Sequence, residues 1–419
     1  MTAAFPQIKG HVDRGLTVTL CPNTLLSVVI LSSLVFASYF GRNGVVVFLL
    51  AGLILLLRRA DLTRAEFRAY WWLYLLPLWC ILSLLWSEEP QLSLRHGTQL
   101  AITFLVAVTL ANRLSPLMFL RVLYLSLVLA GVASLLIGNV REDGIWLGIY
   151  DSKNYYAFSM VALVLCSLAL AADRMQALTW RLAGVMGALL GLPQILMAES
   201  VGAVLAVIFV LAAALVMLGA HLLPPARRVL ALGVFCLVAF GLLVVALQFS
   251  DAILDKVVQV TGKDPSLTGR TDLWQSALGE IGRSPFLGNG YRSFWVEGNP
   301  LAEQLWADFH IESKSGFNFH NLYLSSAVDV GLIGVGLHLL LLLPALVLGT
   351  RWVLLLGGAP ALFCFMAVAF VLVLSLVEVP VFFEFDALTV MVLASLVYGL
   401  RAARELPQLQ RRGLAPRLS

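Results

Sequence analysis

A histidine at the end of a long polar segment is the first candidate for chemistry. His320 closes the segment 250–320 and is followed at once by an apolar run. An imidazole titrates near neutral pH and can accept the proton of an attacking hydroxyl, so His320 could act as a general base. Two alternatives stay open, because His320 could simply satisfy a helix end, and the nearby His310 could face the site in its place.

An arginine in the same segment could bind an anion. Arg270 follows Gly269 at the start of a stretch whose apolar residues, from Leu273 to Ile281, recur at helical spacing. The planar guanidinium suits bidentate contact with a phosphate or diphosphate, and the N-terminus of the predicted helix would add positive potential. We expect this amphipathic helix to lie against the membrane surface. An ordinary surface arginine is the alternative for Arg270.

Two further cations flank a short turn that is otherwise rich in acids. Arg141 and Lys153 bracket Glu142, Asp143 and Asp151. The two cations could bind the same anion as Arg270. They could equally form local ion pairs with those three acids.

One carboxylate lies inside a predicted transmembrane helix. Asp329 falls within the apolar run 322–349, where an unpaired carboxylate is costly, so it should face a polar cavity or a partner. It could orient His320 or Arg270. It could also form a hydrogen bond between helices that takes no part in chemistry.

Three more acids follow in a later turn. Glu378, Glu384 and Asp386 surround a Pro and several Phe and Val residues. They could bind a sugar or balance the cationic site, but we interpret them as solvated charges at the membrane interface.

The elements that must position these residues are transmembrane helices. The 419 residues are 60% hydrophobic and 12% charged, with a mean hydropathy of +0.91, whereas about a quarter of residues in soluble domains are charged. The basic residues are scattered without interleaved aromatics, which excludes nucleic-acid binding. The sequence predicts an all-α integral membrane protein with about twelve spans. Their ranges are 24–40, 44–57, 70–86, 98–111, 117–137, 155–172, 182–198, 201–220, 229–249, 322–349, 359–377 and 382–400.

The distribution of basic residues predicts the orientation of these helices. With a cytoplasmic N-terminus, 18 of the 28 Lys and Arg residues fall in cytoplasmic segments, as the positive-inside rule requires. Both termini are then cytoplasmic, and the large loop 250–320 is periplasmic. The predicted organisation is nine helices in 1–249, the loop with its short helices in 250–320, and three helices with a basic tail in 321–419.

No motif in the sequence indicates a cofactor. Nucleotide-binding and metalloenzyme signatures are absent from it, and its five cysteines lack the spacing of a zinc site. We therefore expect neither a cofactor nor a metal.

The order of these residues resembles that in the O-antigen ligase and polymerase superfamily of bacterial membrane glycosyltransferases. The resemblance rests on Arg141…Lys153-Asn154 in an outer turn, on Gly269-Arg270…Trp274…Pro285-Phe-Leu-Gly-Asn-Gly in the loop, and on His320-Asn321…Asp329…Gly331…Gly334. The stretch from Gly288 to Trp295 looks most like the exopolysaccharide repeat-unit polymerases. One departure is Asp329, where the family often has Glu.

The resemblance implies a GT-C-like fold in the bacterial inner membrane and a metal-independent transferase. Its donor would be an undecaprenyl-diphosphate-linked glycan, bound at the diphosphate by Arg141, Arg270 and Lys153. His320 would activate the acceptor, with Asn154, Asn321 and Asp329 in support. A flippase and a chain-length regulator of the same pathway would be its protein partners.

Two other functions stay open. The acceptor could be a second lipid-linked glycan, as for a polymerase, or the lipid A core, as for a ligase. A transporter or lipid-linked glycan flippase is the alternative of another class. Such proteins usually bind at mid-membrane within symmetric halves, whereas the polar residues here gather at one face and the halves show no symmetry.

Overall fold

The computed structural model describes residues 21–248 and 266–411, and the regular elements of this part of the chain are helices apart from one small hairpin. Predictions for 1–20, for 249–265 of the ninth helix and loop, and for the tail beyond 411 lie outside these residues. The first elements are α1 (Pro22–Val35), α2 (Ala37–Phe40), α3 (Arg42–Leu57), α4 (Ala60–Ala69), η1 (Trp71–Tyr74), α5 (Leu75–Leu82), η2 (Ser83–Leu85), α6 (Pro90–Arg113), α7 (Pro116–Ile137), β1 (Asn139–Val140) and β2 (Trp146–Gly148). The remaining elements are α8 (Lys153–Ala172), α9 (Leu178–Met197), α10 (Val201–His221), α11 (Pro225–Gln248), α13 (Ser266–Arg283), α14 (Pro300–Asp308), α15 (Leu322–Leu355), α16 (Ala359–Leu374) and α17 (Ala387–Arg411).

Membrane-spanning helices account for most of the described chain. By length and apolar composition, seven described helices could cross a membrane, or eight if α4 and the segment 71–85, bent by 81°, form one span. The shorter apolar helices α1, α3 and α16 accompany them. The prediction of an all-α, multi-pass membrane protein is confirmed. The number of twelve spans stays a prediction.

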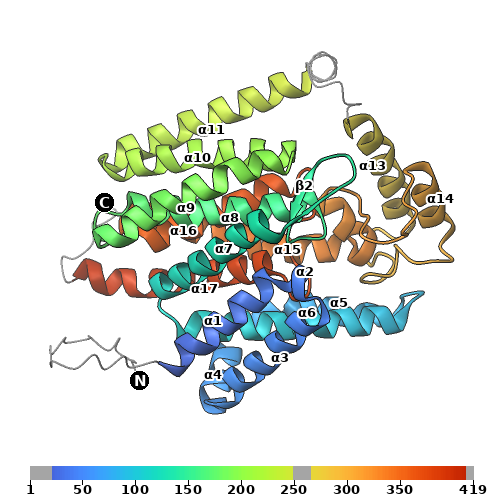
Figure 1. Ribbon diagram of the computed structural model, residues 1–419, viewed down its shortest axis with the longest axis horizontal. Coiled ribbons are helices and arrows are strands. Elements are labelled where there is room, and N and C mark those ends of the chain that lie inside the picture. The colour runs from blue at the N-terminus through green and yellow to red at the C-terminus, as the bar shows by residue number, and fades with distance from the viewer. Residues whose placement is uncertain (1–20, 249–265, 412–419) are drawn as a thin grey trace.

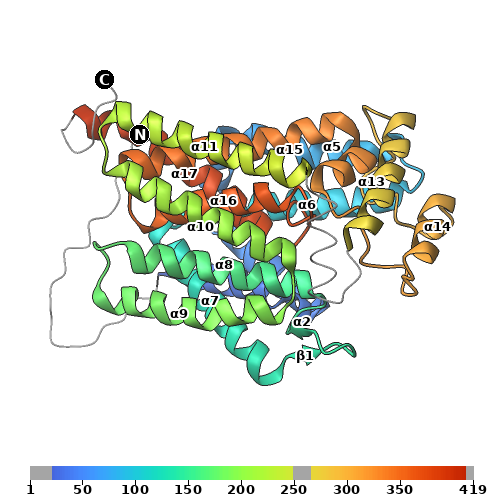
Figure 2. The same cartoon turned by 90° about the horizontal axis from the view of Figure 1, so that it is seen from above.

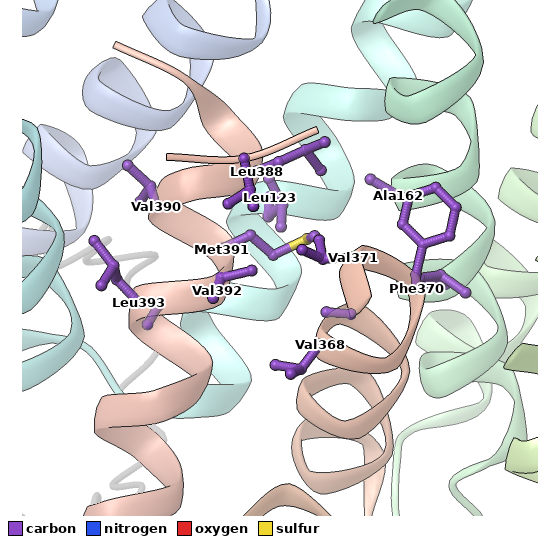
Figure 3. Packing of buried hydrophobic residues seen from close by; sticks show 14 of the residues in the cluster. Leu123, Ala162, Val368, Phe370, Val371, Leu388, Val390, Met391, Val392 and Leu393 are labelled. Carbon is purple, nitrogen blue, oxygen red and sulfur yellow. The ribbon is translucent and has the colours of Figure 1, made fainter. Parts of the chain in front are cut away.

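The helices lie side by side along the long axis of the molecule, with α13 and α14 at one end and the C-terminal part of α17 at the other (Figures 1 and 2). α16 is central, since it packs on α7, α8, α10, α15 and α17. Figure 3 shows this core, in which Val371 of α16 lies beside Met391 of α17, while Phe370 of α16 lies beside Ala162 of α8. The end that carries α13 and α14 is therefore built on a closely packed bundle.

Apolar side chains also cover the outside of the bundle. Leu189 of α9 and both Leu205 and Leu215 of α10 are exposed. Such a surface is unfavourable in water, but it matches the hydrocarbon interior of a bilayer.

Two predicted helices differ from the observed ones at their ends or in their middle. The span predicted over 24–40 breaks at Phe36 into α1 and α2. The last predicted helix starts at Ala387 instead of 382, because Phe382 and Phe385 have positive φ angles of 67° and 54°. The Asp386 carboxylate then caps α17 by accepting a hydrogen bond from the backbone N–H of Thr389 at 2.6 Å.

The long loop has a hydrophobic cluster of its own. Leu273 and Ala277 on the apolar face of α13 are buried with Phe294, Trp306 and Phe319. The predicted amphipathic helix is thus present as α13, and its buried face packs on the loop. Its position against the membrane surface stays a prediction.

A break in α15 attaches the loop to the bundle. Gly331 has φ +69° and ψ −178°, which interrupts the helical backbone beside Val330. Four hydrogen bonds use the freed backbone groups: Asn289 N–H to Val328 O at 2.8 Å, Gly290 N–H to Asp329 O at 2.8 Å, Leu332 N–H to Pro285 O at 2.8 Å, and the Trp79 indole N–H to Val330 O at 2.9 Å. Irregular backbone at the level of a membrane is tolerated only where such partners exist.

Candidate active site

His320 lies directly before α15 in a fixed backbone conformation. Its φ of +46° falls in the left-handed region, which is uncommon for a residue with a side chain. Its N–H donates to the Asn318 side chain at 2.7 Å. Asn321 then caps α15, because its Oδ1 accepts from the N–H groups of Tyr323 and Leu324. These local bonds hold the imidazole at the start of the helix.

Glu378 connects His320 with Arg270. Its Oε2 lies 2.9 Å from Nδ1 of His320, and its Oε1 accepts from Nη2 of Arg270 at 2.7 Å. Glu378 is only 5% exposed, so the interpretation of this acid as a solvated interface charge is wrong. A single buried carboxylate therefore binds both residues that the sequence singled out in the loop.

The peptide segment after α16 holds Glu378 in place. The N–H of Leu322 donates to the carbonyl of Ser375 at 3.0 Å, and the Asn321 side chain donates to the carbonyl of Leu376 at 3.0 Å. Asn321 thus contributes twice, once as the cap of α15 and once as a tie between α15 and the Glu378 segment.

The contact with Glu378 determines which nitrogen of His320 is basic. An ionised carboxylate can only accept hydrogen bonds, so Nδ1 must carry the hydrogen in the contact with Oε2. In a neutral imidazole the lone pair is then on Nε2, the atom that would accept a proton. His320 is 26% exposed at its side chain and Arg270 is 19% exposed, which leaves both accessible to a substrate.

Arg270 belongs to α13 itself, one turn after its start, whereas the sequence placed it before the helix. The indole N–H of Trp274, one turn further on, donates to the carbonyl of Phe319 at 2.8 Å. This bond links α13 to the residue that precedes His320.

His310 and His320 are now distinguished. His310 follows α14 and is exposed, with a positive φ of 55°. His320 contacts Glu378, so His320 is the histidine that faces the candidate site.

Arg141 is paired on its own turn between β1 and β2. Its Nε donates to Asp143 at 2.9 Å, and both side chains are 48% exposed. The hydrogen bond from Arg141 lowers the pKa of Asp143 to about 2, and the same bond raises the pKa of Arg141. The local ion pair that the sequence left open is therefore present in the structure.

Lys153 and Asn154 form the first turn of α8. The side-chain Oδ1 of Asn154 accepts a hydrogen bond from the Ser200 hydroxyl at 2.9 Å. Asn154 thereby ties the start of α8 to the start of α10.

Asp329 lies in a second polar cluster. The guanidinium and backbone N–H of Arg292 lie beside its carboxylate, and Arg292 Nη2 also contacts Glu384 Oε1 at 3.2 Å. Glu384 in turn contacts Nδ1 of His96 at 2.7 Å. Among the described residues, Asp329 is thus grouped with Arg292 and Glu384, and its suggested role in orienting His320 or Arg270 stays a prediction.

Glu384 is strongly influenced by this cluster. Burial would raise its pKa, but the hydrogen bond with His96 and the charge of Arg292 outweigh burial and lower the pKa to about 2. Glu384 is therefore a half-buried acid that stays ionised, on the same segment as Glu378.

Sequence reasoning missed the importance of Glu378 and of Arg292. A signal for Glu378 was present, because an acid beside Pro380 in an apolar outer turn is expensive unless it has a partner. Among the described residues, no three His, Cys, Asp or Glu side chains converge as a metal ion would require.

Known proteins are similar to much of this chain. A family model described as O-antigen ligase matches residues 186–339, a range that includes Arg270, His320 and Asp329. The chain is also 30% identical over 323 residues to the exopolysaccharide production protein ExoQ of Rhizobium meliloti (strain 1021), across 75% of this chain and 74% of that protein.

Proposed function

The chain belongs to the O-antigen ligase and polymerase family, and from that premise we propose that it is a membrane glycosyltransferase whose donor is a glycan linked to polyprenyl diphosphate. The observation that carries the proposal is the carboxylate of Glu378, which contacts a histidine on one oxygen and an arginine on the other. Glu378 thereby holds together His320, which can remove a proton, and Arg270, which can bind an anionic leaving group.

The reaction is a substitution at the anomeric carbon of the donor. The acceptor hydroxyl oxygen forms the new bond to that carbon, and its proton moves to Nε2 of His320. The bond from the anomeric carbon to the diphosphate oxygen breaks, and polyprenyl diphosphate leaves with the electron pair. Glu378 stabilises the imidazolium that results, as a carboxylate does beside a catalytic histidine.

Arg270 assists the departure of the diphosphate. Negative charge grows on the leaving group during the reaction, so a fixed cation stabilises the transition state more than the ground state. A guanidinium has five N–H donors, and Arg270 uses Nη2 to donate to Glu378. Its other N–H groups could donate to the diphosphate. Arg141 and Lys153 would bind the diphosphate as well, which requires Arg141 to exchange its Asp143 contact for the substrate.

The site would act at the periplasmic face of a bacterial inner membrane, with both termini in the cytoplasm. The charge distribution of the sequence supports this orientation. Alkaline phosphatase fused at Lys263 should be active, whereas fusions after Arg64 and Arg404 should be inactive. An inactive fusion at Lys263 would reverse the orientation and move the site to the cytoplasmic side.

We propose that the acceptor is a second lipid-linked repeat and that the product is a longer exopolysaccharide. The similarity to an exopolysaccharide production protein favours this acceptor. Transfer to lipid A core is the second candidate, because the matching family model is described as O-antigen ligase. Deletion of the gene for this protein distinguishes the two acceptors. Loss of long exopolysaccharide with unchanged lipopolysaccharide is the result expected only for a polymerase.

The decisive experiment uses the purified full-length protein in nanodiscs without nucleotide or divalent metal. Supplied with lipid-linked repeats, the wild type should produce longer lipid-linked glycans. A transporter or flippase would form no glycosidic bond under these conditions, so the absence of product despite bound substrate would overturn the proposed function.

A further inference from the structure

A cavity separate from the Glu378 contacts lies between the N-terminal helices and the segment before α17. Its volume is about 360 Å³, within the range of small-molecule binding sites. One side is apolar, with walls from α1, α7, α8 and α17. Leu123, Ala162, Leu388 and Met391, all visible in Figure 3, contribute to these walls.

The other side of the cavity is polar and carries a net negative charge. Among the described residues that line the cavity, Asp151, Glu384 and Asp386 supply three carboxylates and Arg292 supplies one cation. The Arg292 guanidinium already has partners in the protein. Its Nη2 lies 3.2 Å from Glu384 Oε1, and its central carbon lies 4.6 Å from the centroid of the Phe383 ring. A diphosphate would be repelled by the two excess carboxylates. A neutral ligand that offers hydroxyl donors to them would not be.

Two buried polar atoms on this side have no hydrogen-bond partner. The Tyr150 hydroxyl belongs to a side chain that is only 6% exposed, and it makes no hydrogen bond of standard geometry in the described chain. Nε of Arg292 is also without such a partner. Buried polar atoms are rarely left unsatisfied, so these two mark a place for a ligand that both donates and accepts.

We propose that this cavity binds a saccharide, through its carboxylates, Tyr150 and Arg292, while the diphosphate binds elsewhere at Arg270. Sugar hydroxyls both donate and accept hydrogen bonds, and sugar C–H faces pack against aromatic rings such as that of Phe383. The proposal rests on the proposed function and names a part of its substrate. Glu384 lies six residues after Glu378, a separation of at most about 20 Å, so the saccharide in the cavity can belong to the same glycan that reacts at His320.

The test variant is Tyr150→Phe, which removes only the unpartnered hydroxyl. Because that hydroxyl approaches the Ser159 side chain but makes no hydrogen bond of standard geometry in the described chain, the melting temperature should change little. Tyr398→Phe is the matched control, since its buried hydroxyl is also unpartnered but lies outside this cavity. Two probes are titrated into the full-length protein in nanodiscs. One is the oligosaccharide repeat released from the strain's own polysaccharide, and the other is farnesyl diphosphate.

The dissociation constant for the oligosaccharide should rise by roughly three- to tenfold in Tyr150→Phe, the scale of one lost hydrogen bond. It should be unchanged in Tyr398→Phe, and farnesyl diphosphate should bind both variants as it binds the wild type. The proposal is overturned if the wild type binds no oligosaccharide at about 10 mM, a concentration at which even weak sites fill. It is equally overturned if Tyr150→Phe weakens only farnesyl diphosphate.

A competition experiment then shows whether the bound saccharide belongs to the donor or to the acceptor. Farnesyl diphosphate linked to one sugar is added at saturation to occupy the donor site. Oligosaccharide that still binds then belongs to the acceptor, and oligosaccharide that is displaced belongs to the donor. Because these measurements are of binding, they stand apart from turnover. If the protein binds the saccharide but forms no glycosidic bond, the proposed transferase function is overturned, while the assignment of this cavity as a saccharide site remains.

Discussion

His320 and Glu378 lie 58 residues apart in the sequence, yet Nδ1 of one is 2.9 Å from Oε2 of the other. The same carboxylate accepts a hydrogen bond from Arg270 at 2.7 Å. Removal of Glu378 should therefore affect proton transfer and diphosphate binding in different ways, which makes it the most informative position to change.

Glu378→Gln should lower the rate of glycosidic bond formation by about 10²–10⁴-fold. The amide keeps the shape of the side chain but can no longer stabilise a protonated His320, and it can select the wrong tautomer of the ring. Turnover of lipid-linked repeats in nanodiscs measures the effect. Glu303→Gln, at an exposed position of α14, is the control and should be neutral. A Glu378→Gln protein with full activity would remove Glu378 from the mechanism.

His320→Ala should lower turnover by about 10²–10⁴-fold, the usual scale for loss of a general base. Donor binding should change by only a few fold, because the diphosphate is bound by arginines in this mechanism. The variant should thus accumulate bound, unreacted donor. Undiminished product formation would contradict the role of His320 as the base.

Arg270→Ala should weaken donor binding itself. Arg270→Lys should cause more than half of the loss of binding free energy that Arg270→Ala causes. A lysine is a point charge that cannot reproduce the bidentate grip of a guanidinium on a phosphate. Titration with a lipid-linked donor gives both values. If the lysine variant binds the donor as well as the wild type does, Arg270 contributes only charge or takes no part.

Gly331→Ala should destabilise the protein by roughly 3 kcal/mol or more, because its backbone lies in a region that only glycine adopts without strain. An added Cβ would also meet the Phe286 carbonyl oxygen at 2.0 Å. Gly336→Ala in the same helix is the matched control, since nothing lies within 4 Å of its Cβ. Thermal unfolding should show a large loss for the first variant and none for the second. Equal melting temperatures would mean that the break in α15 does not depend on glycine.

Acid should destabilise the wild type through Glu384. Its pKa falls from 4.5 to about 2 in the folded protein, so its contribution is complete above about pH 4.5 and is lost as the pH falls towards 2. Glu384→Gln should be less stable than the wild type at pH 6, and the difference in melting temperature should close as the pH approaches 2. A constant difference over this range would show that the charge of Glu384 does not stabilise the fold.

The sequence predicted the helices well, because apolar runs of sufficient length have few alternatives in a membrane. It also singled out His320 and Arg270, which the structure brings together at Glu378, while their roles in catalysis stay predictions. The break in α15 at Gly331 could not be predicted, since it depends on hydrogen bonds from residues 285–290 that lie far away in the chain.

The role of Glu378 was hidden for a similar reason. In sequence, Glu378, Glu384 and Asp386 look alike, as acids in one apolar turn. In the structure they have three different partners, namely His320 with Arg270, His96 with Arg292, and the N-terminus of α17. Periodicity reports which face of a helix is buried, but it does not report which distant side chain arrives opposite an acid.

The attachment of residues 285–290 to the break in α15 constrains how such proteins can be recombined. Asn289 and Gly290 bond to carbonyls that an unbroken helix would use internally. A chimaera that receives this loop from a relative must therefore receive the matching part of α15 as well, or unpaired backbone groups will remain within the bundle. Insertions should be tolerated at the exposed residues 312–316 after α14 and not at this junction. The natural unit for domain exchange is the loop together with the helix that follows it.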